Sequence, residues 1–305
     1  MKNSSAIQKK KHKQDGILHL MMIPSIVITF VFCYVPLLGS IMAFQDFKPA
    51  KGFFRSKWVG LDNFKFVANL PGIDRVMWNT IYIALWKMVL GILVPLLFAL
   101  LLNEVKNQGI KRGIQTLIYL PNFLSWVILS GIFIDILSPS TGLVNKFLGL
   151  FGVEPIYFLG DKFWFPITMI VTDVWKNFGF GSIIYLAALT GIDPTLYEAA
   201  AIDGATRFKQ TIHVTLPGMA PIIVLMTVLS MGNILNAGFD QIFNMISASV
   251  YETGDILDFF IYRLGMQQQQ FSPAAAVGLF RSVVSFIFVS VSYFLADKLA
   301  NYRIF

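Results

Sequence analysis

The 305-residue chain has little with which to build a metal or disulfide site. Its one cysteine, Cys33, lies inside an apolar run, so a disulfide within the chain is excluded. The three histidines, His12, His19 and His213, are far apart in the sequence and predict no histidine-based metal site. The sequence also lacks a phosphate-binding loop of the GxxxxGKS or GxxxxGKT kind. We therefore expect no metal and no cofactor, and we expect any ATP that drives this chain to be hydrolysed by another protein.

Charged residues are also scarce, and their scarcity places the chain in lipid. Only 13% of its residues are Asp, Glu, Lys or Arg, whereas 56% are hydrophobic. A soluble domain has about 25% charged residues and cannot hide so much apolar surface from water. The net charge of +7 does not indicate nucleic-acid binding, because the basic residues lie in short loops between apolar runs. The composition predicts an integral membrane protein.

The chain begins with a lysine cluster that is followed by a long apolar run. Lys9, Lys10, Lys11 and Lys13 precede residues 16–44, which contain no Asp, Glu, Lys or Arg. This run is longer than the roughly 7–15 residues of a signal-peptide core, and no small-residue cleavage site follows it. We predict a retained first span, preceded by a basic N-tail over residues 1–16.

Six windows have the length and apolarity of a membrane-spanning helix, which needs roughly 20 mostly apolar residues. None alternates between apolar and polar residues as a barrel strand does, so helices are expected. The sequence thus predicts an all-α, polytopic membrane protein with a six-span domain over residues 17–296. The windows are residues 17–43, 77–102, 114–136, 166–190, 217–237 and 273–296.

The distribution of Lys and Arg predicts the orientation of the spans. If the N-terminus lies inside, twelve of these residues are on inner segments, nine are on outer loops and three are within spans. The bias is modest, because six of the nine occur in one outer loop, residues 44–76. The lysine cluster still favours an inner N-terminus. The loop over residues 191–217 and the C-tail over residues 297–305 are then cytoplasmic as well, and the protein is expected in the cell membrane.

The loop between the fourth and fifth windows has strong helix signals. Asp193 is a favourable N-cap, and Pro194 suits the first helical position. Three alanines at 199–201 favour a helix, and Gly204 can adopt the left-handed conformation that ends one. A second helix is expected from Thr206 to Thr215, before the fifth span. These signals predict a helix-turn-helix along the cytoplasmic face.

The same loop carries a spaced motif. Glu198-Ala199-Ala200 is followed after three residues by Gly204, and after nine more by Val214-Thr215-Leu216-Pro217. This resembles the EAA loop of binding-protein-dependent ABC importer permeases, whose pattern is EAA, three residues, Gly, nine residues and then Ile-x-Leu-Pro. Val214 stands where Ile is usual, which is a conservative change. Spacing and composition match over twenty residues.

Three further stretches resemble the sugar-transporting branch of this family, and more closely the permeases of complex-oligosaccharide and polysaccharide importers. They are residues 58–64 (WVGLDNF), 119–122 (YLPN) and 233–241 (NILNAGFDQ). The predicted spans and the position of the loop also match the topology of these permeases. Importers of amino acids, phosphate and metals share the EAA loop, so an ABC permease for a non-sugar solute is the alternative.

The resemblance implies an importer of an oligosaccharide in which this chain is a non-catalytic permease. Two ATPase subunits, which bind ATP and Mg, would dock onto the loop and switch the spans between outward-facing and inward-facing states. A second homologous permease subunit and an extracellular solute-binding lipoprotein would complete the assembly. The predicted docking residues on the motif are Glu198, Ala199, Ala200, Gly204, Leu216 and Pro217, and Asp203 lies in its variable stretch. The simpler alternative is an ordinary amphipathic hairpin at the membrane surface.

Four charged residues within the spans are candidates for the substrate path, because a charge in lipid is costly unless it faces a cavity or a partner. They are Lys87, Asp173, Lys176 and Arg281. Asp173 and Lys176 are three residues apart on one helix face, so they either neutralise each other or line the path. Three basic residues against one acidic residue would suit an anionic substrate such as a uronate-containing oligosaccharide. Each charge can equally bond a carbonyl group of a neighbouring helix.

Aromatic and amide side chains complete the predicted path. Trp175, Asn177 and Phe178 adjoin Lys176, and sugars are commonly held by aromatic faces together with polar side chains. Asn233 and Asn236, near the outer end of the fifth window, can hydrogen-bond sugar hydroxyls or join helices to each other.

Two other functional classes fit the sequence less well. A membrane-embedded lipid or glycosyl transferase needs convergent acidic residues or histidines at a membrane face, and Asp173 alone does not form such a site. A secondary transporter or channel needs no docking loop, yet this chain has one with the family spacing.

Overall fold

The computed structural model of the protein describes the backbone of residues 19–300 and the side chains of residues 19–294. The predicted basic N-tail over residues 1–16 lies outside the described residues, as do the last five residues of the predicted C-tail. The chain divides into two compact units. The first comprises Met1–Ala68 with Leu264–Leu279, and the second comprises Asn69–Arg263 with Phe280–Phe305.

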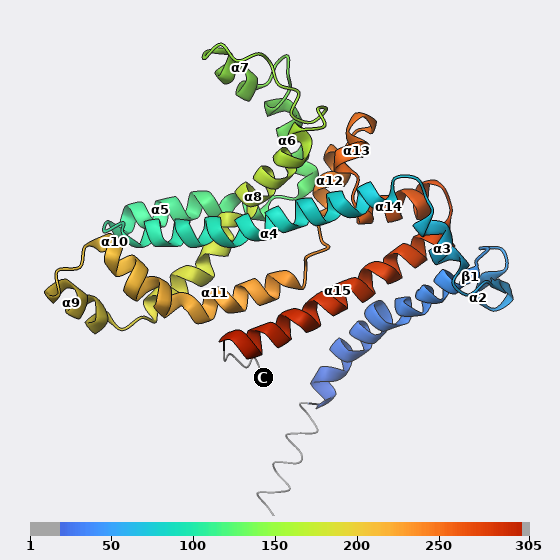
Figure 1. Ribbon diagram of the computed structural model, residues 1–305, viewed down its shortest axis with the longest axis horizontal. Helices are drawn as coiled ribbons and strands as arrows, with labels where there is room; N and C mark the ends of the chain where they lie inside the picture. The colour runs from blue at the N-terminus through green and yellow to red at the C-terminus, as the bar shows by residue number, and fades with distance from the viewer. Residues whose placement is uncertain (1–18, 301–305) are drawn as a thin grey trace, which may run out of the picture. The chain divides into compact units, whose positions relative to one another are not determined.

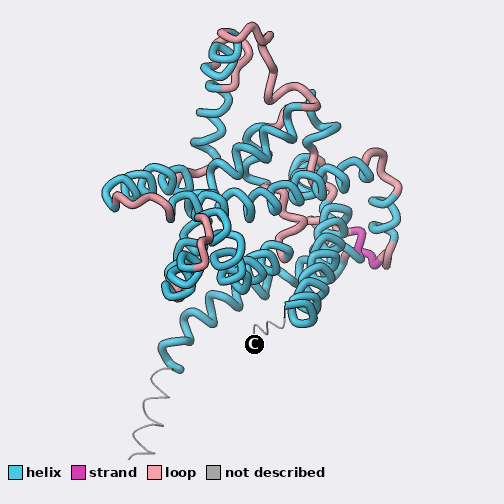
Figure 2. Tube along the Cα trace, turned by 60° about the vertical axis from the view of Figure 1, so that its left-hand side comes forward, coloured by secondary structure: helices cyan, strands magenta, loops and turns pink. Residues whose placement is uncertain are grey.

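The described residues are mostly helical, as the sequence predicts. Figure 2 shows one small strand pair among the helices. In it, β1 (Gln45–Asp46) runs antiparallel to β2 (Lys57–Trp58), with Gln45 opposite Trp58. The predicted all-α class is confirmed.

The first unit begins with a long apolar helix over His19–Phe44. Its second half changes from a π-helix to a 3-10 helix at Pro36, a residue that lacks the N–H an α-helix needs. The elements of this unit are η1 (Phe30–Tyr34), η2 (Val35–Phe44), the strand pair, α2 (Gly52–Arg55), α3 (Asp62–Ala68) and the start of α15 (Phe271–Ala300).

The first predicted outer loop is ordered by hydrogen bonds within this unit. On α3, Asn63 donates from Nδ2 to the carbonyl oxygens of Ala43 and Gln45, each at 2.9 Å. The backbone N–H of Phe47 donates to Ser272 Oγ, at the start of α15, at 2.8 Å. The loop therefore has a defined fold of its own within this unit.

Two long helices form the centre of the second unit. α4 (Ile73–Asn103) and α8 (Trp164–Thr190) lie side by side (Figure 1). Their buried side chains belong to two apolar clusters, one around Phe165 and the other around Tyr185. These helices cover the predicted second and fourth windows.

The third predicted window, residues 114–136, is not one straight helix. The chain turns by 104° between two helical pieces, and Pro121 lies just before the turn. Ser125 caps the second piece, where its Oγ accepts the N–H of Ile128 at 3.4 Å. The prediction of an uninterrupted third span is wrong, because a hydropathy window averages over these local signals. The pieces are α5 (Gln108–Tyr119) with η3 (Leu120–Phe123), and α6 (Trp126–Ile136).

Among the described residues, four helices are long and apolar enough to cross a membrane, and the bent pair would make five. The helix α8 does not reach the same apolarity, although it is 27 residues long. In the fifth predicted window the helix ends earlier than expected, at Met231, which leaves Asn233 in a turn and Asn236 in the loop that follows. The helices that qualify are His19–Phe44, Ile73–Asn103, Arg207–Met231 and Phe271–Phe294.

The two remaining predicted outer loops contain short helices. α12 packs against α6 and α8, and α14 packs against α4 and α12. The chain after the fifth span therefore folds back onto the central helix pair, which brings its polar residues to α4 and α8. The short elements are α7 (Leu143–Gly149), α12 (Phe239–Met245), η5 (Ala248–Val250), α13 (Tyr251–Gly254), α14 (Leu257–Tyr262) and η6 (Arg263–Gln267).

Candidate functional site

The predicted docking loop forms a helix-turn-helix, and its first helix is α9 (Pro194–Ile202). Asp193 caps this helix, since its Oδ1 accepts the N–H of Thr195 at 2.9 Å. The same hydrogen bond lowers the pKa of the Asp193 carboxyl, because it favours the charged form. The N-cap predicted from the sequence is present.

Gly204 ends α9 in the left-handed conformation, with φ at +74°. The N–H of Ala205 donates to the carbonyl oxygen of Ala200 at 2.9 Å, and the N–H of Gly204 donates to that of Ala201 at 3.1 Å. These two bonds form a Schellman motif, which satisfies the last carbonyl groups of a helix. A residue with a Cβ is strained at this φ, although no neighbouring atom lies within 4 Å of the place where its Cβ would be.

The loop presents an exposed surface that mixes polar and apolar groups. Ile202 is 86% exposed and Phe208 is 74% exposed. Of the predicted docking residues, Glu198, Ala199, Asp203, Gly204 and Pro217 are exposed, and Ala200 and Leu216 are half-buried.

The second helix of the loop is continuous with the fifth span. The expected separate helix from Thr206 to Thr215 is wrong in this respect, because helical structure runs without a break to Met231. Pro217 lacks the N–H that a regular α-helix needs, and a π-turn lies directly before it. The continuous helix consists of α10 (Arg207–Gln210), η4 (Thr211–Thr215) and α11 (Leu216–Met231).

Two side-chain contacts fix α9 and its turn to this continuous helix. The hydroxyl of Tyr197, on α9, lies 2.9 Å from Thr215 Oγ1. Gln210 donates from Nε2 to the carbonyl oxygen of Ala205 at 3.3 Å. Both contacts therefore join the first part of the loop to a helix that is long and apolar enough to cross a membrane.

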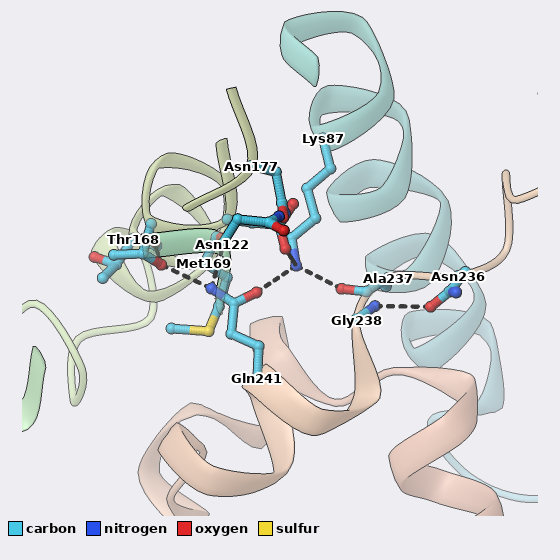
Figure 3. A network of polar contacts seen from close by, with 11 residues as sticks. Lys87, Asn122, Thr168, Met169, Asn177, Asn236, Ala237, Gly238 and Gln241 are labelled. Carbon is cyan, nitrogen blue, oxygen red and sulfur yellow. Dashed lines mark hydrogen bonds and ion pairs between the residues drawn. The ribbon is translucent and has the colours of Figure 1, made fainter. Parts of the chain in front are cut away.

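Lys87 is the centre of a buried polar network that joins three parts of the second unit (Figure 3). From α4, its ammonium group donates to the carbonyl oxygen of Ala237 at 2.7 Å and to Gln241 Oε1. Gln241, on α12, donates from Nε2 to the carbonyl oxygen of Met169, on α8, at 2.9 Å. Asp173 Oδ1, also on α8, lies 3.7 Å from Lys87 Nζ.

The network fixes the segment between the fifth span and α12. Gly238, in this segment, has φ at +90°, and a Cβ there would lie 2.7 Å from Lys87 Nζ. Glycine therefore leaves room for the lysine. The side chain of Lys87 is 8% exposed and that of Asp173 is 21% exposed, so the two charges are largely removed from solvent and compensate each other.

A cavity of about 500 Å³ adjoins the network, and we call it the polar cavity. More than half of the predicted path residues meet there. Asn177 is oriented by Asn122, whose Nδ2 donates to its Oδ1 at 3.1 Å. The predicted residues that line the cavity are Lys87, Asp173, Asn177, Asn233 and Asn236.

Two predicted path residues pack against other rings. Trp175 lies edge to face against Phe133, with ring centroids 5.5 Å apart. Phe178 lies edge to face against Phe98, with centroids 5.2 Å apart. Neither residue lines the polar cavity.

Lys176 does not pair with Asp173, so that predicted alternative is wrong. Its Nζ lies 5.1 Å from the ring centroid of Trp126, on α6. Asp173 instead faces Lys87 on a different helix. A sequence separation of three residues allows a pair but does not determine which way the side chains turn.

Arg281 lines a second cavity, of about 580 Å³, which we call the aromatic cavity. One guanidinium nitrogen, Nη1, lies 2.6 Å from Asp258 Oδ1. Asn236 and Gly238 line both cavities. Sequence reasoning missed Asp258 and Gln241 as site residues, because both lie outside the apolar windows. The side chains that line the aromatic cavity include Trp126, Asn236, Phe239, Asp240, Asp258, Tyr262 and Arg281.

A further buried ion pair lies in the turns beyond the fifth span. Asp255 pairs with Arg263, and Asn79 of α4 donates to the backbone carbonyl of Asp255 at 3.2 Å. Burial raises the pKa of the Asp255 carboxyl to about 6, and the charge of Arg263 opposes that shift. In the part of the chain that is described, no group of three or more His, Cys, Asp or Glu side chains is placed to hold a metal ion.

Residues 91–301 match the family described as binding-protein-dependent transport system inner membrane component. The chain belongs to this family. The predicted docking loop, α8 and the segment that lines both cavities all lie within the matched residues. The family membership predicted from the EAA motif is confirmed.

Similar proteins include importer permeases for saccharides. The polygalacturonan/rhamnogalacturonan transport system permease protein YteP of Bacillus subtilis (strain 168) is 39% identical over 292 residues, which are 96% of this chain and 91% of that protein. A chain of a bacterial ABC transporter involved in the import of the acidic polysaccharide alginate has a TM-score of 0.87 at 37% identity, covering 95% of this chain and 98% of that one. A chain of the alginate transporter in complex with an alginate pentasaccharide-bound periplasmic protein has a TM-score of 0.87 at 36% identity, covering 97% and 99%. The predicted permease fold is therefore confirmed.

Proposed function

We propose that this chain is the permease subunit of an ABC importer that moves a carbohydrate across the cell membrane by alternating access. The observation that carries the proposal is α9, an exposed and capped helix at the EAA motif that is joined by the turn at Gly204 to the continuous helix Arg207–Met231, which is long and apolar enough to cross a membrane. Saccharide cargo is supported by the similar proteins, which serve transport of polygalacturonan or rhamnogalacturonan and of alginate.

The proposed assembly has four kinds of component. This chain pairs with a second homologous permease, and two ATPase subunits dock on the cytoplasmic loops. The ATPases bind ATP and Mg, so this chain needs no cofactor of its own and is not catalytic. An extracellular binding lipoprotein delivers the oligosaccharide, as the complex of a similar transporter with a periplasmic protein suggests. Both termini of this chain are cytoplasmic in this arrangement.

The coupling path follows from the contacts of α9. Closure of the ATPases displaces α9, and the contact between Tyr197 and Thr215 passes the displacement to the helix Arg207–Met231. That helix ends just before Asn233 and Asn236, which line the polar cavity. Movement of the cytoplasmic loop therefore reshapes the wall of the cavity.

The polar cavity offers hydrogen-bonding groups rather than a net charge. Asn177, Asn233 and Asn236 supply amides that can bond sugar hydroxyls. Lys87 and Asp173 neutralise each other, so Lys87 positions the cavity wall instead of attracting an anion. Arg281 is paired with Asp258 in the same way. Two of the three basic residues within the spans are thus paired with carboxylates, and the third, Lys176, lies over the ring of Trp126, so their number alone is no argument for an anionic substrate.

The test is uptake of radiolabelled galacturonate oligosaccharides into proteoliposomes that contain the full complex and its binding protein. We expect uptake that requires ATP on the side of the membrane where the ATPase subunits lie. The variant Glu198→Arg, at an exposed position of α9, should abolish this uptake. Glu154→Arg, an equal charge reversal at an exposed position in an outer loop, is the matched control and should transport normally. Normal uptake with Glu198→Arg would contradict the docking role.

Two alternatives give different results in the same assay. A permease for a non-sugar solute would require ATP but would leave the saccharides outside. A secondary transporter would take up solute without ATP when an ion gradient is imposed.

A further inference from the structure

The two cavities of the second unit differ in their chemistry. The polar cavity is lined by amides and by a neutralised ion pair. The aromatic cavity is lined by three rings, those of Trp126, Phe239 and Tyr262. Binding pockets for small organic molecules combine apolar and aromatic walls with a few convergent polar groups, and the aromatic cavity has this composition.

The polar groups of the aromatic cavity suit vicinal hydroxyls. Arg281 is a planar donor fork, and Asp258 holds it through one nitrogen, Nη1, at 2.6 Å. Its Nε is buried and has no acceptor among the described residues. Asp240 and Asn236 add carboxylate and amide oxygens to the wall. Neighbouring hydroxyls of a sugar ring both donate and accept, so they can bond such donors and acceptors together.

The charges of the aromatic cavity favour hydroxyls over carboxylates. Two carboxylates, those of Asp240 and Asp258, face one guanidinium, that of Arg281. The positive charge is already paired with Asp258. The cavity therefore recognises the apolar face of a sugar ring and its hydroxyl groups, and not an anionic substituent.

The two cavities adjoin each other at the segment Asn236–Gly238, which hydrogen bonds hold in place. Asn236 and Gly238 line both of them. Asn236 Oδ1 accepts the N–H of Gly238 at 3.2 Å, and Lys87 holds the carbonyl oxygen of Ala237 between them. A chain of linked sugar residues that enters both spaces would contact this short segment from both sides.

We propose that the aromatic cavity is a second saccharide subsite, and that the cargo is an oligosaccharide whose sugar residues occupy both cavities on either side of Asn236–Gly238. This inference rests on the proposed function, since it takes the cargo to be a saccharide. It adds that recognition within the spans uses stacking on Trp126 and Tyr262, together with hydroxyl contacts to Asp240 and Arg281.

The test is equilibrium binding of radiolabelled galactose and of a neutral pentamer of galactose to the purified, nucleotide-free complex. Wild type should bind the pentamer more tightly than the monomer. Trp126→Ala should weaken pentamer binding by about tenfold or more, because aromatic side chains that pack against a bound ligand contribute a large share of the binding energy. Asp240→Asn, at an exposed position, is a second variant that does not risk the fold, and it should weaken pentamer binding as well.

Trp78→Ala is the matched control, because Trp78 is exposed on α4 and lines neither cavity. Pentamer binding that stays within about twofold of wild type in both Trp126→Ala and Asp240→Asn would overturn the second subsite. An equal loss in Trp78→Ala would also overturn it, since the effect would then be unspecific. If the wild-type complex neither binds nor imports any saccharide, the proposed function itself fails.

Discussion

Lys87 and Asp173 lie on different helices, and Lys87 Nζ is 3.7 Å from Asp173 Oδ1 at a largely buried site between α4 and α8. The same lysine holds the carbonyl oxygen of Ala237 and the side chain of Gln241. A buried ion pair adds little stability compared with an apolar pair, but removal of one partner leaves an unpaired charge. Through Lys87, the pair therefore holds the segment after the fifth span against the two central helices.

Removal of Lys87 alone should destabilise the protein more than removal of both charges. We expect Lys87→Met to lower the free energy of unfolding by about 3 kcal/mol, because the Asp173 carboxylate is left without its partner. The double variant Lys87→Met, Asp173→Leu should recover part of this loss, although the hydrogen bonds to Ala237 and Gln241 stay broken. Thermal unfolding of the purified complex measures both. A double variant that is less stable than Lys87→Met would contradict the compensation of the two charges.

Asp255, in the turns outside the membrane spans, should make stability depend on pH. Burial raises its pKa from the usual 3.8 to about 6, so the folded protein holds this proton more tightly than the unfolded chain does. The neutral acid therefore favours the folded state below about pH 4, and this contribution is lost as the pH rises through about 6. Arg263, the charge that faces the carboxylate, reduces the shift without reversing it.

The variant Asp255→Asn stays neutral at every pH and isolates this effect. At about pH 4 we expect wild type and variant to unfold at similar temperatures. At about pH 7.5 we expect the variant to unfold at a higher temperature than wild type. A difference in unfolding temperature that does not change with pH, or that changes in the opposite direction, would show that burial does not raise this pKa.

At Gly179, α8 packs tightly against α5. A Cβ there would lie 2.2 Å from the carbonyl oxygen of Ile118, and a backbone atom cannot move aside cheaply. We expect Gly179→Ala to lower the free energy of unfolding by about 2 kcal/mol, as overpacking does. Gly113→Ala, on α5, is the control: no neighbouring atom lies within 4 Å of the added Cβ, and alanine is the better helix former. Equal unfolding temperatures for the two variants would disprove the close contact.

The docking loop could be predicted because its signals are local. The cap at Asp193 and the left-handed turn at Gly204 each depend on a few neighbouring residues, and both are present. The break at Ser125 also has local signals, namely Pro121 and the serine cap itself. It was missed because a hydropathy window gives the whole apolar run one value.

The ion pairs could not be predicted, because they join residues that are distant in the sequence. Lys87 meets Asp173, and Arg281 meets Asp258, only after α14 and the central helices have packed together. Asp258 lay in a loop outside every apolar window, so a count of charges within the spans left it out. With Asp258 counted, the excess of basic residues falls from two to one, and the remaining basic residue, Lys176, lies over the ring of Trp126.

The central claim is that α9 docks onto an ATPase. The most direct test is affinity purification of the tagged chain from mild detergent, followed by mass spectrometry of the proteins that co-purify. We expect a second permease and an ATPase to co-purify with wild type and with the control Gly149→Ala, where an added Cβ meets nothing within 4 Å. Gly204→Pro should keep the second permease and lose the ATPase, because proline cannot adopt the left-handed φ and has no N–H to donate to Ala201. A chain that purifies alone, or an ATPase retained equally by Gly204→Pro, would contradict the account.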